Sequence, residues 1–107
     1  KNQLKIFKMV FIVVQKKSPY GLLLVVTDKT AIGHIFKENG LQLDLSKDFY
    51  KGDEMSKEQA AELIQRARHI HLTGSKAVGL GIELELVDPG RILHVGKIVH
   101  AEVMIEG

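Results

Sequence analysis

The sequence contains no cysteine and no tryptophan, and it has only 2 prolines among 107 residues. Without cysteine the chain can form neither a disulfide nor a thiolate metal site, and it has no thiol nucleophile. The same absence fits a reducing compartment, so we expect a cytoplasmic protein. Long apolar runs are missing as well, because residues 9–14 and 22–26 are far too short to cross a bilayer. We therefore expect no signal peptide and no membrane partner.

The sequence also lacks a large excess of either charge, because 15 lysines and arginines against 13 acids leave a net charge of +2. A charge this small does not by itself imply a nucleic-acid partner. Its distribution is more informative, since residues 63–82 hold no carboxylate but include Arg66, Arg68 and Lys76. A composition of 45% hydrophobic and 26% charged residues is that of an ordinary globular protein. Residues 1–107 are expected to form a single domain.

Apolar patterns predict five strands. They cover residues 4–15, 21–26, 41–45, 91–95 and 98–105. The first two are separated by a turn sequence, as are the last two, so each pair predicts a hairpin. Residues 46–55 are predicted to be a polar loop. Residues 69–72 fit either the end of a helix or a short extended piece.

Capping signals predict two helices. The first covers residues 31–36, with Asp28 or the threonine before it as the cap and an Asn-Gly pair as its end. The second begins at Ser56, which can form a capping box with Gln59, and its apolar face runs to Ala67.

Residues 75–90, SKAVGLGIELELVDPG, fit two patterns. From Val78 to Leu86 apolar and other residues alternate strictly, as in a strand, but at 100° per residue a solvent stripe also separates from an apolar one. Gly79 and Gly81 would cost a helix roughly 1 kcal/mol each, although Gly81 on the apolar side would allow close approach to a sheet. The Gly-x-Gly does not indicate a nucleotide loop, because the third glycine of that fingerprint is missing.

Four blocks of the sequence are similar to a known family: residues 30–56, HLTGSKAV, GIELELVD and VGKIVHAEV. In this order they resemble the small archaeal family named domain of unknown function 424, over about residues 10–103. The resemblance implies a helix where Gly79 and Gly81 stand. It also implies that Glu85 replaces a usual glycine, so we do not expect a left-handed helix end there. The predicted fold is α+β, a small mixed, largely antiparallel sheet with about three helices packed on it.

Residues 63–82, which hold no carboxylate, predict a site for phosphate groups. A glycine, a serine and a lysine stand at the expected start of the helix, where free amides and the helix dipole favour an anion. An aromatic side chain in the polar loop could stack on a base. The predicted anion or RNA site consists of Tyr50, Arg66, Arg68, Gly74, Ser75 and Lys76. The first hypothesis is therefore a non-enzymatic binding module for RNA or a ribonucleoprotein, associated with translation by analogy only.

The histidines support a different hypothesis. His100, with Glu102 beside it and His71 elsewhere, is the best candidate for acid–base chemistry or for a small-ligand site. His69 and His71 would face the same way on an extended segment, but a zinc site needs three or four converging ligands. Convergence is not visible in a sequence, so no metal and no cofactor are predicted. A third hypothesis is a protein-interaction or dimerisation module.

Overall fold

The computed structural model describes residues 10–106, which form eight strands and two α-helices. The strands are β1 (Val10–Ser18), β2 (Gly21–Asp28), β3 (Ile35–Glu38), β4 (Leu41–Asp44), β5 (Asp53–Ser56), β6 (His69–Thr73), β7 (Leu93–Val95) and β8 (Ile98–Met104). The helices are α1 (Lys57–Ile64) and α2 (Ser75–Glu83), and three single 3₁₀ turns connect other elements. The α+β class is confirmed, but residues 10–106 contain two α-helices and not about three.

Six strands form one sheet in the order β5-β1-β2-β6-β8-β7, and β3 pairs with β4 beside it. In this described sheet β2 and β6 run parallel, and the other neighbouring strands are antiparallel. The prediction of a mixed, largely antiparallel sheet is therefore confirmed. Both predicted hairpins are present, as β1–β2 and β7–β8. Residues 4–9 of the first predicted strand lie outside the described residues.

The predicted helix over residues 31–36 is wrong, because Ala31 ends a 3₁₀ turn and Ile35 begins β3, the first strand of the β3–β4 hairpin. Asn39 and Gly40 occupy the two turn positions with φ angles of 50° and 84°. An Asn-Gly pair with positive φ at both residues is the preferred two-residue hairpin turn, and it can equally be mistaken for a helix end. The predicted loop at 46–55 is also partly wrong, because it contains a 3₁₀ turn and most of the edge strand β5.

The helix α1 begins as predicted. The side chain of Ser56 accepts a hydrogen bond from the amide of Gln59, and the Gln59 side chain accepts one from the amide of Ser56. This reciprocal capping box satisfies two backbone donors. Residues 69–72, left open above, are extended and belong to β6.

The helix α2 confirms the helical interpretation of the disputed stretch. A Cβ on Gly81 would lie 2.6 Å from both Leu72 Cδ1 and Val87 Cγ2, so this glycine permits close packing on the sheet. A Cβ on Gly79 would meet no atom within 4 Å. The expectation for Glu85 is wrong, since its φ is 62° and it ends the helix in the left-handed conformation. The amide of Leu86 donates to the Gly81 carbonyl at 2.9 Å, which completes this C-terminal motif.

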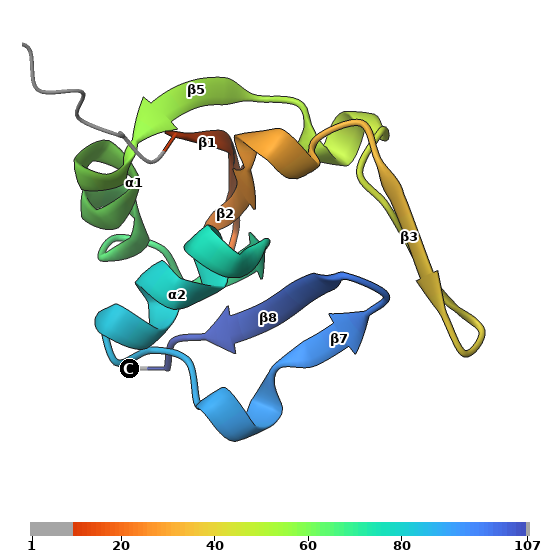
Figure 1. Ribbon diagram of the computed structural model, residues 1–107. Coiled ribbons are helices and arrows are strands. Elements are labelled where there is room, and N and C mark those ends of the chain that lie inside the picture. Colours follow the sequence, from red (N-terminus) through yellow and green to blue (C-terminus); the bar gives the residue numbers. More distant parts are fainter. Residues whose placement is uncertain (1–9, 107) are drawn as a thin grey trace, which may run out of the picture.

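Each face of the sheet carries its own hydrophobic core. Figure 1 shows α1 and α2 on one side and the β3–β4 hairpin extending on the other. The helix-side core includes Phe11, Leu24, Ile70 and Leu72, all fully buried. The far-side core is built around Leu45 and covers only part of the opposite face. The remainder of that face carries polar side chains of β6 and β8.

Candidate functional site

The candidate site lies on the face of the sheet opposite the helices. Successive strand residues point to opposite faces, so the apolar residues of β6 face α2 while His69, His71 and Thr73 face away. On β8, His100 and Glu102 share that outward face. Within the ladder, Glu102 is paired with His71, and His100 with Thr73. The four residues His69, His71, His100 and Glu102 are called the histidine cluster below.

Short distances connect the members of the histidine cluster. Glu102 Oε2 lies 3.1 Å from Nδ1 of His71 and 3.9 Å from Nε2 of His69. The ring centroids of His69 and His71 are 4.7 Å apart, and those of His71 and His100 are 5.8 Å apart. The hydroxyl of Thr73 and Nδ1 of His100 form a hydrogen bond of 2.8 Å. The carboxylate of Glu102 therefore lies near the imidazoles of both His71 and His69.

Two histidines of the cluster, His71 and His100, have lowered pKa values. Burial lowers the pKa of His71, and the neighbouring His69 and His100 lower it further, while Glu102 opposes the shift. Burial likewise lowers the pKa of His100, again with Glu102 opposing. A histidine whose pKa lies below its ordinary value of 6.5 is neutral at physiological pH. Neutral imidazole nitrogens can accept a hydrogen bond or bind a metal ion.

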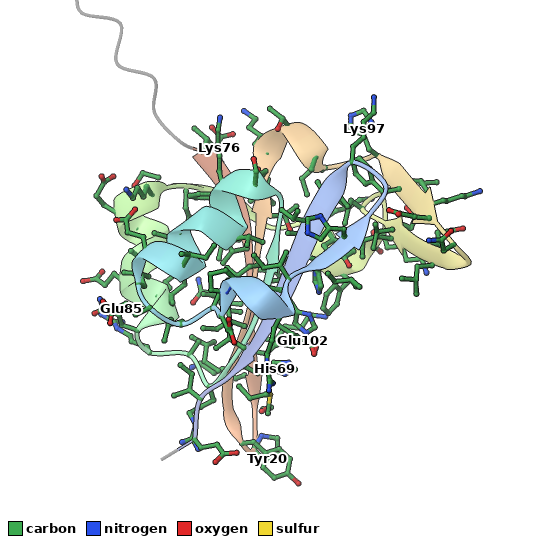
Figure 2. The ribbon with its side chains drawn as sticks, turned by 60° about the horizontal axis from the view of Figure 1, so that its bottom comes forward. Tyr20, His69, Lys76, Glu85, Lys97 and Glu102 are labelled. Carbon is green, nitrogen blue, oxygen red and sulfur yellow. The ribbon has the colours of Figure 1, made fainter. Side chains whose placement is uncertain are left out.

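Phe49 and a groove flank the histidine cluster. The Phe49 ring meets the His71 ring edge-on at a centroid distance of 5.5 Å, and Lys16 Nζ lies 5.0 Å from the Phe49 centroid. The groove has a volume of about 480 Å³ and extends from His69 toward the β1–β2 turn. Its apolar lining residues are Tyr20, Leu22, Leu23, Met104 and Ile105. Figure 2 shows His69 and Glu102 close together, with Tyr20 at the tip of that turn.

An internal carboxylate occupies the predicted anion site at the start of α2. The amides of Lys76 and Ala77 donate to the two carboxylate oxygens of Asp28, at 3.0 and 2.8 Å. The Gly74 amide donates to the Val99 carbonyl at 2.8 Å. A phosphate at this helix start would meet the negative charge of Asp28. The expected cap residue thus caps a helix, but one that lies 48 residues further along the chain.

The other residues of the predicted RNA site do not come together. Arg68 precedes β6 and Lys76 follows it, so about 16 Å of strand separates their backbones, and Figure 2 shows Lys76 far from Tyr20 and His69. Arg68 Nε donates to the Ile105 carbonyl at 3.0 Å, and Arg66 lies 4.0 Å from Glu62. Tyr50 is only 8% exposed and packs in the far-side core.

The structure places the residues of the histidine hypothesis on one face, but its central residue, His100, does not line the groove. His71, His100 and Glu102 do share one face, whereas the groove beside them is lined by His69. The spacing of His69 and His71 was visible in the sequence. The pairing of β6 with β8, which brings Glu102 against both, was not. Phe49 was expected in a loop, and nothing in the sequence placed it against His71.

Comparisons with known proteins identify the family and the fold. The profile of the family "Protein of unknown function (DUF424)" matches residues 16–105. The fold is similar to the crystal structure of an uncharacterized conserved protein from Methanopyrus kandleri, with a TM-score of 0.74 and 21% identity. The match covers 92% of this chain and 96% of that one. No curated protein matches the sequence. Neither helix in the described part of the chain is long and apolar enough for a membrane crossing. On the extent of the profile match, the chain belongs to the DUF424 family.

Proposed function

We propose that this protein binds a small ligand in the groove beside the histidine cluster, at the end of the sheet where β6 begins. The observation that carries the proposal is the groove of about 480 Å³, which opens beside the histidine cluster and has His69 in its wall. Small-ligand sites are typically concave, mainly apolar and equipped with a few polar groups that set orientation. The groove and the cluster together have this composition.

The lining indicates the chemistry of the ligand. Leu22, Leu23 and Met104 offer an apolar wall, while Arg68 and His69 supply polar groups at the side nearest the cluster. Glu106 also lines the groove and disfavours a ligand of high negative charge. A small molecule with an apolar body and a single carboxylate or hydroxyl head fits this arrangement. Benzoate and benzyl alcohol, which differ only in the head group, are suitable probes.

The proposal can be tested by methyl NMR with ¹³C-labelled methionine, in the presence of a metal chelator. Met104 lines the groove, whereas Met55 packs against the helix-side core and serves as an internal control. Titration with either probe is expected to shift the Met104 methyl signal and to leave the Met55 signal in place. Equal shifts at both methyls, or none at either, would refute a site in the groove.

Two arginine variants refine the same test. Arg68→Gln removes the cation that lines the groove, and Arg66→Gln removes one that does not line it. We expect Arg68→Gln to weaken the binding of benzoate more than that of benzyl alcohol. Arg66→Gln is expected to change neither. A loss of benzoate binding in both variants would indicate a general charge effect instead.

RNA or ribonucleoprotein binding stays a prediction and is the second candidate function. It is supported by the exposure of Arg66, Arg68 and Lys76, which lie in a run without carboxylates. The test compares binding to structured cellular RNA at rising salt by the wild type and by the triple variant Arg66→Glu/Arg68→Glu/Lys76→Glu. A steep salt dependence that disappears in the variant supports phosphate contacts, and equally weak binding by both proteins refutes them. Cytoplasmic location and association between copies also stay predictions.

A further inference from the structure

One ring nitrogen in the histidine cluster has no hydrogen-bond partner. Among residues 10–106, the buried side-chain atoms without a partner are His69 Nε2 and the Thr27 hydroxyl. Burying a polar atom without a partner is unfavourable, so such an atom calls for an explanation. The nearest carboxylate oxygen, on Glu102, is 3.9 Å away, which is too far for a hydrogen bond. The contact of 3.1 Å between Glu102 and His71 explains the position of His71 but leaves His69 Nε2 unexplained.

The spacing of the three side chains fits a common cation. One ligand atom from each of His69, His71 and Glu102 can be chosen so that all three lie within 4.8 Å of one another. Bonds of about 2.0–2.1 Å in a tetrahedral zinc site place neighbouring ligand atoms about 3.3 Å apart. The observed separations of 3.1 and 3.9 Å to Glu102 Oε2 bracket that distance. When the three atoms close around an ion, the separation of His69 Nε2 from Glu102 would shorten and that of His71 Nδ1 from Glu102 would lengthen slightly.

The backbone already holds these ligands in place. His69 and His71 stand two residues apart on β6, inside the sheet, and Glu102 is the direct ladder partner of His71 on β8. The side chains of His71 and His69 are 17% and 34% exposed, while that of Glu102 is 52% exposed. The imidazoles are thus largely shielded, and the carboxylate remains accessible enough to adjust when an ion enters.

The donor set narrows the class of metal. Two imidazoles and one carboxylate are typical of catalytic zinc sites and of other first-row transition metals, whereas magnesium and calcium prefer oxygen ligands. From this geometry we propose that His69, His71 and Glu102 bind a divalent transition-metal ion of the zinc class. The ion coordinates Nε2 of His69, Nδ1 of His71 and a carboxylate oxygen of Glu102. The inference rests on the proposed function, because the ion lies at the His69 end of the groove.

Three protein ligands leave a coordination position for water or for the head group of a small ligand. His100 is not in the ligand set, because the group whose ligand atoms all lie within 4.8 Å of one another consists of His69, His71 and Glu102. Because the open position lies beside the groove, the metal would fix one end of a ligand whose apolar body occupies the groove. A carboxylate head would then bind more tightly in the presence of the ion than in a chelator.

The test uses the full chain, stripped of metal and titrated with Zn²⁺ alone or Co²⁺ alone at a pH slightly above neutral. Calorimetry with Zn²⁺ is expected to give one site per chain with a dissociation constant in the micromolar range or tighter. Co²⁺ is expected to give the visible absorption of a low-coordinate site. His69→Gln, His71→Gln and Glu102→Gln should each weaken binding at least about tenfold, because even outer-sphere partners have effects of that size.

His34→Gln is the matched control, since His34 is an exposed histidine that lies outside the cluster. This variant is expected to bind as the wild type does. Circular dichroism of each metal-free variant shows whether it has folded, and thermal unfolding with and without Zn²⁺ gives a second readout. Failure of the wild type to bind either ion, or equal binding by His69→Gln and the wild type, overturns the proposal. Shifts of the Met104 methyl with benzoate in a chelator would then still support the groove, so the two failures are distinguishable.

Discussion

At the scale of single residues, Asp28 has the largest structural role that sequence reasoning missed. The residue is 6% exposed, and its carboxylate accepts two backbone hydrogen bonds from the start of α2. Gly74, immediately before the helix, has a φ of 106°, and a Cβ there would overlap the Asp28 carboxyl. The two residues therefore form one unit, in which the glycine makes room for the acid. A carboxylate at a helix N-terminus also interacts favourably with the helix dipole.

The pH dependence of stability reports on Asp28. Burial raises the pKa of Asp28 above its ordinary value of 3.8, although the amides of Lys76 and Ala77 oppose the shift. Between the unfolded and folded pKa values the folded state binds more protons, so its stability falls as pH rises through that window. We expect the difference in unfolding free energy, wild type minus Asp28→Asn, to decrease from pH 3.8 upward and then level.

Urea unfolding of both proteins from about pH 3 to about pH 7 measures this difference. The variant keeps a side chain of similar shape and one acceptor oxygen, and it does not titrate at that position. A difference that increases with pH would contradict the expectation. It would mean that the two amide hydrogen bonds outweigh the effect of burial.

At the scale of elements, α2 contains two glycines with opposite roles. We expect Gly79→Ala to stabilise the protein by about 0.5–1 kcal/mol, because its Cβ enters open space and alanine favours the helix. Gly81→Ala is expected to destabilise it by about 1–3 kcal/mol, since its Cβ would collide with Leu72 and Val87. Urea unfolding of the two variants gives both values. Destabilisation by both would show that the exposed side of α2 has no room for a methyl group at Gly79.

The sequence predicted a helix or strand correctly where the interactions that form it join residues close together in the chain. The capping box of Ser56 and Gln59 is closed within four residues, so the start of α1 was predicted correctly, whereas its end lies at Ile64 and not at Ala67. The Asn39-Gly40 pair was ambiguous, because glycine after asparagine ends helices and also turns hairpins. The segment becomes a strand because β3 pairs with β4. Pairing between strands cannot be read from the apolar spacing of residues 31–36 alone.

The candidate site was predictable only in part, for a similar reason. His71, His100 and Glu102 were named from the sequence, and they do share a face. What brought Glu102 to both histidines is the antiparallel register of β6 and β8, which pairs residues about thirty positions apart. The apolar groove depends on the approach of the β1–β2 turn to the end of β8, and no local pattern encodes that approach.

At the scale of the whole molecule, the sheet is covered unequally on its two faces. Leu45 is fully buried in the far-side core, together with Val25, Val95 and Tyr50. We expect Leu45→Ala to lower the free energy of unfolding by about 2–5 kcal/mol, as is usual for a buried leucine. Leu41→Ala, on the same hairpin but 48% exposed, should change it by less than about 0.5 kcal/mol.

Urea unfolding of these two variants shows whether the β3–β4 hairpin is a stable part of the fold. A small effect of Leu45→Ala would mean that the far-side core contributes little and that the hairpin opens independently. Because Phe49 packs against this core and also meets His71, loosening here would reach the histidine cluster. The metal-binding test on Leu45→Ala would detect that connection as weaker affinity with unchanged stoichiometry.

The capping of α2 by Asp28 has a kinetic consequence. The helix contains two glycines and no capping side chain of its own, so it has little tendency to form early in folding. Its cap arrives only when β2 and β6 have found their parallel register, a contact between distant parts of the chain. Long-range parallel pairing is slow, because a long loop must close first. We therefore expect φ-values near zero for Ala77→Gly and higher values on β1 and β2, so that α2 is added after the rate-limiting step.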